Sequence, residues 1–505
     1  MRLRPFAMFA MFAMSITAAS LAAAAVVSAG ARQQSPAAKV PAVPAAAPTT
    51  TGPVALTSAV HDAAHGYPFN ASTMDLAKLG YVEEEFFIQG VARSYDVPRD
   101  QMSNATAAEA THPYKTRIVV RRPAAPGRFN GTAIVEWANV SEGFDNEVDW
   151  FHTSEHLVRA GYAWVGVSAQ NVGVSALKQW SPSRYAALDV TDGATVMGDA
   201  LSYDIFTAAG RAVRGKATAS VMGSLKVERL IATGHSQSAG RLATYTNSVH
   251  PLAPVYDAVV LHGGGGRMRT DLNVKIWKLL AETDVLGQIV ARQPDSDKYR
   301  TWEVAGASHL DFKHATELVK LGLRSKETML PNPPPAPAAG GGGGRRGGGP
   351  GFGGAPGPFN GCNHPPLSRV PSEYVQDALY DHLARWLKDG TAPPAAPPIE
   401  IKTDGERPSI VRDSFGNALG GIRLSEHGVA TATNSGENTG SGFCFLTGWH
   451  EGFDKTKLNT LYSTHGAYVS AVKALTEQNL KTGYIVKADG QRTIAEAELS
   501  EVGKS

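Results

Sequence analysis

Ser236 lies in a stretch whose residue types suit nucleophilic catalysis. In VERLIATGHSQSAGRLATYTN, Val227 to Asn247, an apolar run ends at Gly234 and an amphipathic helical pattern follows the serine. A strand, sharp turn and helix of this kind can hold a serine hydroxyl above a sheet while the next backbone N–H faces a developing oxyanion. Gly234, Ser236 and Ser238 take the three fixed places of G-x-S-x-G, with serine in place of the last glycine. The stretch therefore predicts Ser236 as the nucleophile.

Two other interpretations of this stretch are open. Ser236, Ser238 and Gly240 also satisfy a small-x-Ser-x-small pattern, which would make Ser238 the nucleophile. That residue would then lie inside the first helical turn, and Gly234 would have no purpose. The stretch could also be a serine-capped helix after a buried strand, because serine is a favoured N-cap residue.

A serine nucleophile needs a base within hydrogen-bond reach and an acid that orients the base. Asp284 closes the predicted strand KIWKLLAETD, and His309 follows the predicted strand TWEVAGAS. Serine, acid and histidine then follow one of the known triad orders, with each residue beyond a strand end. Glu282 competes with Asp284, which is favoured because a loop position just past the strand reaches the histidine more easily. Either acid could instead be a solvated residue at a strand end.

The histidine has rivals elsewhere in the sequence, namely His235, His262, His314 and His364. His309 is favoured because it follows both the acid and a strand. His262 also ends a predicted strand, but it precedes the acid and is followed by four glycines. We expect it to line the site or to pack beneath it.

The oxyanion needs two backbone N–H donors. Gln237, directly after the nucleophile, supplies the first. The second is expected from the loop after the strand GTAIVEW, where Ala138 and Asn139 are both candidates. The run HGGGG at His262–Gly266 lies after the nucleophile and is interpreted as a loop.

The surrounding pattern predicts a sheet that could position these residues. Polar and apolar residues alternate at 81–95 and 115–123, as in antiparallel strands with one solvated face. Nearly continuous apolar runs at 131–140 and 162–170 indicate parallel strands covered on both faces. Further strands are predicted at 256–264, 274–286 and 299–311, and helices at 152–161, 201–214 and 372–390.

The chain divides into four parts by composition. Residues 1–31, with Arg2 and Arg4 before an Ala-rich apolar run, have the pattern of an export signal, although a retained anchor is the alternative. Residues 32–51 are predicted to be a disordered leader. A catalytic core at 52–400 contains a Gly/Pro-rich insertion, 331–358, predicted to be disordered. Residues 401–505 are predicted to form an extension packed on the core. We therefore expect an exported protein, periplasmic or secreted.

The sequence contains two cysteines, Cys362 and Cys444. In an oxidising compartment such a pair can form a disulfide. The long loop it would close contributes on the order of 4 kcal/mol in the chain-entropy model. Two separately buried thiols are the alternative.

Charge and motifs limit the classes of ligand. The formal charge is only +2, with acids and bases interspersed, so no nucleic-acid partner and no polybasic membrane patch are indicated. No stable membrane insertion is expected after signal removal. Neither a metal nor an organic cofactor is implied, because the sequence lacks HExxH and clustered metal-ligand spacings. The sequence does not indicate an oligomeric state.

Six motifs allow a comparison with known families: WANVSEG (137–143), WVGVSAQ (164–170), GHSQSAGRLATYTNSVHPL (234–252), AETDV (281–285), GASHLD (306–311) and RDSFGNALGGIRL (412–424). With the predicted triad, they resemble the α/β-hydrolase superfamily, and more narrowly the large exported bacterial "alpha/beta hydrolase domain" proteins. The resemblance covers nearly the whole chain after the leader and implies a serine hydrolase. It also implies an α/β-hydrolase fold, with a mostly parallel central sheet, helices on both faces and a C-terminal extension or cap.

The predicted activity is hydrolysis of carboxylic esters through an acyl-enzyme, with Ser236 as nucleophile, His309 as base and Asp284 as orienting acid. The substrate would be a small-molecule or polymeric ester. A peptidase, amidase or polyester depolymerase could use the same triad. A non-catalytic binding protein on a hydrolase fold is the alternative from another class.

Overall fold

The computed structural model describes residues 47–60, 62–325 and 361–504. These residues belong to one compact unit, Ala42–Ser505. The predicted export signal at 1–31 and the predicted insertion at 331–358 lie outside the described residues, as does most of the predicted leader.

A nine-stranded sheet is the centre of the described part of the chain, in the order β1-β2-β5-β7-β6-β8-β9-β10-β11. Strands β6 to β11 run parallel to one another, whereas β1, β2 and β5 pair antiparallel at one edge. The mostly parallel sheet is therefore confirmed. The strands are β1 (Thr49–Thr51), β2 (Tyr81–Ala92), β5 (His112–Pro123), β6 (Thr132–Trp137), β7 (Ala163–Val167), β8 (Arg229–His235), β9 (Ala258–His262), β10 (Lys275–Ala281) and β11 (Tyr299–Val304).

The central strands are buried on both faces, which explains their continuous apolar sequences. Every residue of β6 is buried. Val135 and Trp137 face one hydrophobic core, and Ile134 between them faces the other. Because successive side chains of a strand point to opposite faces of the sheet, one apolar run contributes to both cores.

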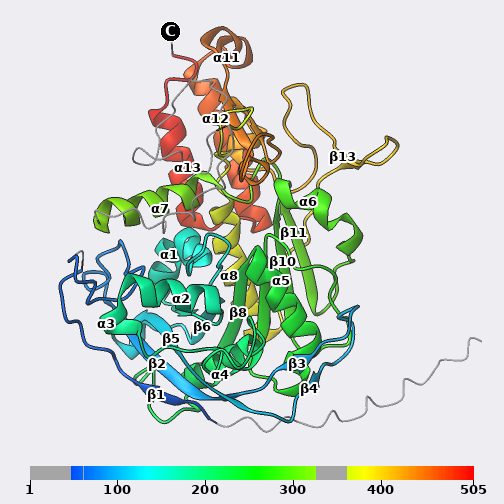
Figure 1. Ribbon diagram of the computed structural model, residues 1–505. Helices are drawn as coiled ribbons and strands as arrows, with labels where there is room; N and C mark the ends of the chain where they lie inside the picture. The colour runs from blue at the N-terminus through cyan, green and yellow to red at the C-terminus, as the bar shows by residue number, and fades with distance from the viewer. Residues whose placement is uncertain (1–46, 61, 326–360, 505) are drawn as a thin grey trace, which may run out of the picture. The chain divides into compact units, whose positions relative to one another are not determined.

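Helices cover both faces of this sheet (Figure 1). On one face α4 packs on β6, and α5 packs on β8 and β9. On the other face α1 and α8 contact each other and β8. The helices before the extension are α1 (Val148–Ala160), α2 (Asn171–Trp180), α3 (Pro182–Tyr185), α4 (Ser202–Val213), α5 (Gln237–Thr244), α6 (Glu282–Gln288), α7 (Phe312–Ser325) and α8 (Ser372–Asp389).

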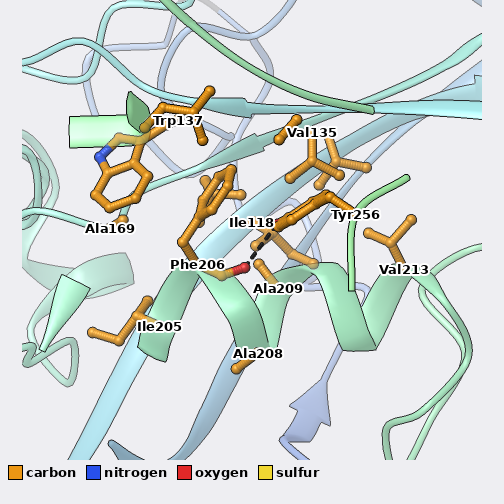
Figure 2. Close-up of a cluster of buried hydrophobic side chains, with 14 of the residues drawn as sticks. Ile118, Val135, Trp137, Ala169, Ile205, Phe206, Ala208, Ala209, Val213 and Tyr256 are labelled. Atoms are coloured by element: carbon orange, nitrogen blue, oxygen red, sulfur yellow. Dashed lines mark hydrogen bonds between the residues drawn. The ribbon is translucent and has the colours of Figure 1, made fainter. Parts of the chain in front are cut away.

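Figure 2 shows the core between α4 and the sheet. The Phe206 ring lies 4.7 Å from that of Trp137 and 5.0 Å from that of Tyr256, measured between centroids. The Tyr256 hydroxyl donates a 2.7 Å hydrogen bond to the Phe206 carbonyl. A buried tyrosine usually finds such a partner, so its polar end is compatible with this core.

Two boundaries differ from the sequence prediction. Thr49–Thr51, predicted as the end of a disordered leader, form β1, because their backbone pairs with Phe87–Gln89 of β2. The predicted strand at 274–286 ends at Ala281 and continues directly as α6. The turn is stabilised there because the carboxylate of Asp284, the third residue of α6, accepts the N–H of the N-cap residue Ala281 at 2.8 Å, as in a capping box.

The C-terminal extension completes the edge of the sheet. Ile422 lies beside β11, where its N–H donates to Glu303 O at 2.7 Å and its carbonyl accepts from Ala305 N at 3.0 Å. Its elements are β12 (Ile401–Lys402), β13 (Ser409–Ile410), α9 (Ser425–Gly428), β14 (Ala432–Ser435), α10 (Cys444–Thr447), β15 (Trp449–Gly452), α11 (Lys455–Leu461), α12 (His465–Thr482) and α13 (Lys487–Leu499). The segment around Ile422 thus extends the sheet by backbone pairing with β11.

Cys362 and Cys444 form a disulfide, with their Cα atoms 5.2 Å apart. This confirms the pairing proposed from the sequence. The bond ties α10 to the segment that precedes α8. Among the described residues, the structure contains no helix both long and apolar enough to cross a membrane.

Candidate active site

Ser236 stands at the sharp turn between β8 and α5. Its backbone has φ 59° and ψ −116°, a conformation that side-chain-bearing residues rarely adopt. Its N–H donates to His262 O at 2.9 Å. A Cβ on Gly234 would lie 3.1 Å from the backbone carbon of Ser238, so only glycine fits comfortably where the helix passes the strand end. The local geometry is that of a nucleophile elbow.

Ser238, the rival serine, is fully buried in the first turn of α5. Its hydroxyl donates to His235 O at 2.8 Å. This bond fixes the turn from within and leaves the hydroxyl no access to a substrate. The geometry therefore favours Ser236 of the two.

Asp284 and His309 lie in contact beyond the ends of β10 and β11. His309 Nδ1 and Asp284 Oδ1 are 2.6 Å apart, and both side chains are buried. His309 N also donates to Thr283 Oγ1 at 3.1 Å, so the same turn of α6 holds the backbone and the ring of the histidine.

Glu282, the competing acid, has a different set of partners. One of its carboxylate oxygens accepts from Gly306 N at 2.7 Å, and the other accepts from Gly436 N at 3.0 Å and Arg412 Nη2 at 2.7 Å. Burial raises the pKa of this carboxyl, and the Arg412 charge opposes the shift. Glu282 thus links the turn of the candidate triad acid to the extension.

Ser236 and His309 line one small cavity of about 90 Å³. Apolar walls come from Leu310 and from Phe443 and Leu446 of the extension. Leu310 N donates to Leu446 O at 2.9 Å, which holds the extension against the residue next to His309. The cavity is therefore built jointly by the core and the extension.

The other side of the cavity is polar. Asn146 Nδ2 donates to Glu142 Oε2 at 2.8 Å and lies 3.2 Å from His314 Nε2. Burial raises the pKa of Glu142 to about 7 and lowers that of His314 to about 3. His314 is therefore a neutral ring at physiological pH.

The remaining histidines do not contact the candidate acid. The His235 ring lies between His309 and His262, with centroids 4.4 and 4.5 Å away, and burial lowers its pKa. His262 Nδ1 is 2.8 Å from the buried Asp149 Oδ1, so this histidine packs beneath the site as expected. His364 stacks on Trp449.

Both candidates for the second oxyanion donor have other partners. Ala138 N donates to Val167 O at 3.3 Å, and Asn139 N donates to Asn146 O at 3.0 Å. Both N–H groups are thus engaged within the fold, and the Asn139 bond belongs to a β-bridge with Asn146. Gln237 is the first residue of α5, where a backbone N–H has no partner within the helix.

Comparison with known proteins identifies the family. The sequence profile of a family described as "Alpha/beta hydrolase domain" matches residues 50–495. The chain belongs to this family. No curated protein matches it.

Solved structures similar to this alpha/beta hydrolase include a serine hydrolase without lid from Xanthomonas campestris (13% identity, 49% of this chain and 97% of that chain, TM-score 0.25). Another is a dienelactone hydrolase from Anabaena variabilis (16% identity, 48% of this chain and 97% of that chain, TM-score 0.25). A third is a carboxylesterase from Lactobacillus plantarum (10% identity, 47% of this chain and 80% of that chain, TM-score 0.22). Likenesses of this extent carry no argument about the reaction or its substrate.

Several residues of this alpha/beta hydrolase site were not predicted from the sequence as site residues. Phe443 and Leu446 reach the cavity from a segment with no readable motif. Asn146 and Glu142 belong to the acid-rich stretch after WANV, whose position directly after a central strand could have drawn attention to it. Within the described ranges, no group of three or more His, Cys, Asp or Glu side chains is arranged to hold a metal ion.

Proposed function

We propose that this alpha/beta hydrolase is a serine hydrolase of carboxylic esters. The observation that carries the proposal is the hydrogen-bonded His309–Asp284 pair, whose histidine shares one cavity with the serine of a strained elbow. Ser236 is the proposed nucleophile, His309 the general base and Asp284 the orienting acid.

The geometry supports a specific catalytic role for each of these residues. Asp284 accepts the Nδ1 proton of His309, so the Nε2 lone pair is available to take the Ser236 proton as the hydroxyl attacks the ester carbonyl. The Gln237 N–H stabilises the oxyanion. His309 then protonates the leaving alcohol, and a water molecule activated in the same way releases the acid.

The size of the cavity favours esters with one small group. A space of about 90 Å³ holds only a few non-hydrogen atoms, and it is closed on one side by Phe443 and Leu446. We propose that this space receives the alcohol of the ester, because His309 lines it and must protonate the leaving oxygen.

We also propose that the protein is exported. The Cys362–Cys444 disulfide supports this proposal, since such bonds persist in oxidising compartments. Cell fractionation with N-terminal sequencing of the mature protein would test it. A cytoplasmic, full-length product would contradict it.

The activity is tested with a fluorophosphonate probe and p-nitrophenyl acetate. The probe is expected to label Ser236, and Ser236→Ala should abolish both labelling and turnover. Ser238→Ala is the matched control, expected to keep labelling at Ser236. Absence of labelling in the folded wild type would refute the proposal and favour a non-catalytic binding protein.

A further inference from the structure

A second, larger groove begins beside the candidate oxyanion donor. It has a volume of about 890 Å³ and follows one side of α5 from Gln237 to Thr244. We call it the α5 groove. Its other walls are the loop 97–102, Tyr203 and the segment 265–267.

The glycine run after β9 connects this groove with the candidate triad. A Cβ on Gly263 would lie 3.0 Å from the ring of His309, and one on Gly264 would lie 3.5 Å from the Ser236 carbonyl oxygen. The glycine run therefore lies beside the His309 ring and the Ser236 backbone before it forms the groove wall at Gly265–Arg267. The groove thus begins at Gln237, one residue after Ser236.

The α5 groove is lined by three arginines and one acid, Asp100. Arg241 is paired with Asp199 at 3.1 Å. Arg99 and Arg267 are exposed, and within the described ranges neither guanidinium has an ion pair or a hydrogen bond. The groove thus has two cationic side chains whose charges are not paired.

The backbones that carry these two arginines are anchored to the nucleophile helix. Asn247 lies in the π-helical turn Tyr245–Val249 directly after α5, and its side chain donates to Arg267 O at 3.0 Å and accepts from Arg269 N at 3.0 Å. Thr244 Oγ1 donates to Gln101 Oε1 at 2.7 Å, next to Arg99 on the opposite wall. The wall that carries Arg267 is therefore held in place before a ligand arrives, which reduces the entropic cost of binding, and the loop of Arg99 is linked to α5 through one side-chain bond.

Two further contacts stiffen the same walls. Arg269 Nη1 donates to Asn104 Oδ1 at 2.7 Å and so joins the two loops. The buried Lys278 ammonium donates to Gly266 O, and burial lowers its pKa to about 8. These contacts fix the backbone beside Arg267 and leave its side chain exposed.

We propose that the α5 groove binds an acyl chain that ends in an anionic group, so that the preferred substrates are monoesters of dicarboxylic acids. This rests on the proposed esterase function. The acyl side is assigned because the alcohol must leave next to His309 in the small cavity, whereas the groove begins at Gln237, where the carbonyl oxygen is held. The terminal carboxylate then meets Arg99 and Arg267.

The reaction balances without a cofactor. Ser236 Oγ forms a bond to the acyl carbon, the ester C–O bond breaks, and the serine proton passes through His309 to the alcohol. Water then cleaves the acyl-enzyme, and the products are the alcohol, a dicarboxylate and one proton.

The test compares kcat/KM for methyl hydrogen adipate, an anion at pH 7.5, with that for neutral dimethyl adipate. Exposed ion pairs contribute little individually, so Arg267→Gln and Arg99→Gln should each reduce hydrolysis of the anion by ~2–5-fold and leave the neutral ester unchanged. The double variant should lose most of the preference. Arg407→Gln, an exposed arginine outside the groove with the same charge change, is the control and should change neither rate.

The outcomes separate the two proposals. Turnover of the neutral ester by the variants shows that they are folded. Equal kcat/KM for the two esters in the wild type would overturn the inference but not the esterase function. A preference that survives in the double variant, or that favours an anionic alcohol part as in 6-acetoxyhexanoate, would also overturn it. If neither ester is hydrolysed and the probe does not label Ser236, the proposed function fails as well.

Discussion

Replacement of Asp284 with Asn tests the proposed site most sharply, because one carboxylate satisfies two donors. It accepts the Ala281 N–H at 2.8 Å and the His309 Nδ1 proton at 2.6 Å. The amide of asparagine has only one acceptor oxygen. If that oxygen stays on Ala281, the amide NH₂ faces His309, and the ring can accept this bond only by moving its own proton to Nε2.

A ring protonated at Nε2 cannot take the Ser236 proton. We therefore expect kcat for p-nitrophenyl acetate to fall by about 10⁴-fold, the scale known for an amide in place of a triad carboxylate. This corresponds to about 5.5 kcal/mol of activation free energy. The free energy of unfolding should change by only about 1 kcal/mol, because one hydrogen bond is altered.

Glu282→Gln is the matched control two residues earlier. It weakens the bonds to Gly306, Gly436 and Arg412, so the free energy of unfolding should fall by about 1–3 kcal/mol. The folded enzyme should keep its kcat. Both variants are compared by their initial rates and by urea unfolding. The assignment of Asp284 as the acid would be refuted if Asp284→Asn kept a near-normal kcat while Glu282→Gln was folded but inactive.

Three further predictions concern the cavity and its surroundings. Serine at both Cys362 and Cys444 should lower the free energy of unfolding by about 4 kcal/mol in the chain-entropy model, measured in guanidinium, and an unchanged midpoint would contradict this. Phe443→Ala removes one wall of the cavity and should raise kcat/KM for bulky alcohols relative to methyl esters; a uniform change across an alcohol series would argue against a size limit at this wall. Because burial raises the pKa of Glu142 to about 7, its contribution to stability should be full below about pH 4.5 and be lost as pH rises to about 7. Glu142→Gln should therefore flatten the decline of Tm over this range, and parallel Tm profiles would count against the shift.

The sheet could be predicted from local sequence patterns, because its central strands are continuously apolar and its antiparallel edge strands alternate polar and apolar residues. The turn at Ser236 could also be predicted, because it needs small residues only at neighbouring positions of the sequence. The choice between Glu282 and Asp284 depends on Arg412 and Gly436, which are distant in sequence and brought near only by packing. The same holds for Phe443 at the cavity and for β1, whose three residues gain their structure from β2.

The hydrogen bonds and side-chain positions of the loops could not be predicted from the sequence either. The Asn139–Asn146 bridge uses an N–H that was one of two candidates for the second oxyanion donor. The arginines of the α5 groove are scattered along the chain, in a composition with nearly balanced charge. Only the fold gathers Arg99 and Arg267 on one groove.

The bond between Leu310 N and Leu446 O has a consequence for biosynthesis. A nascent chain acquires Ser236, Asp284 and His309 long before it acquires the wall that closes their cavity. Until residues 443 and 446 have been made, the cavity lacks the wall that Phe443 and Leu446 supply, whereas Arg412, the partner of Glu282, has been made earlier. We expect chains that end before this point to lack the proposed hydrolase activity, because their proposed catalytic residues are not enclosed.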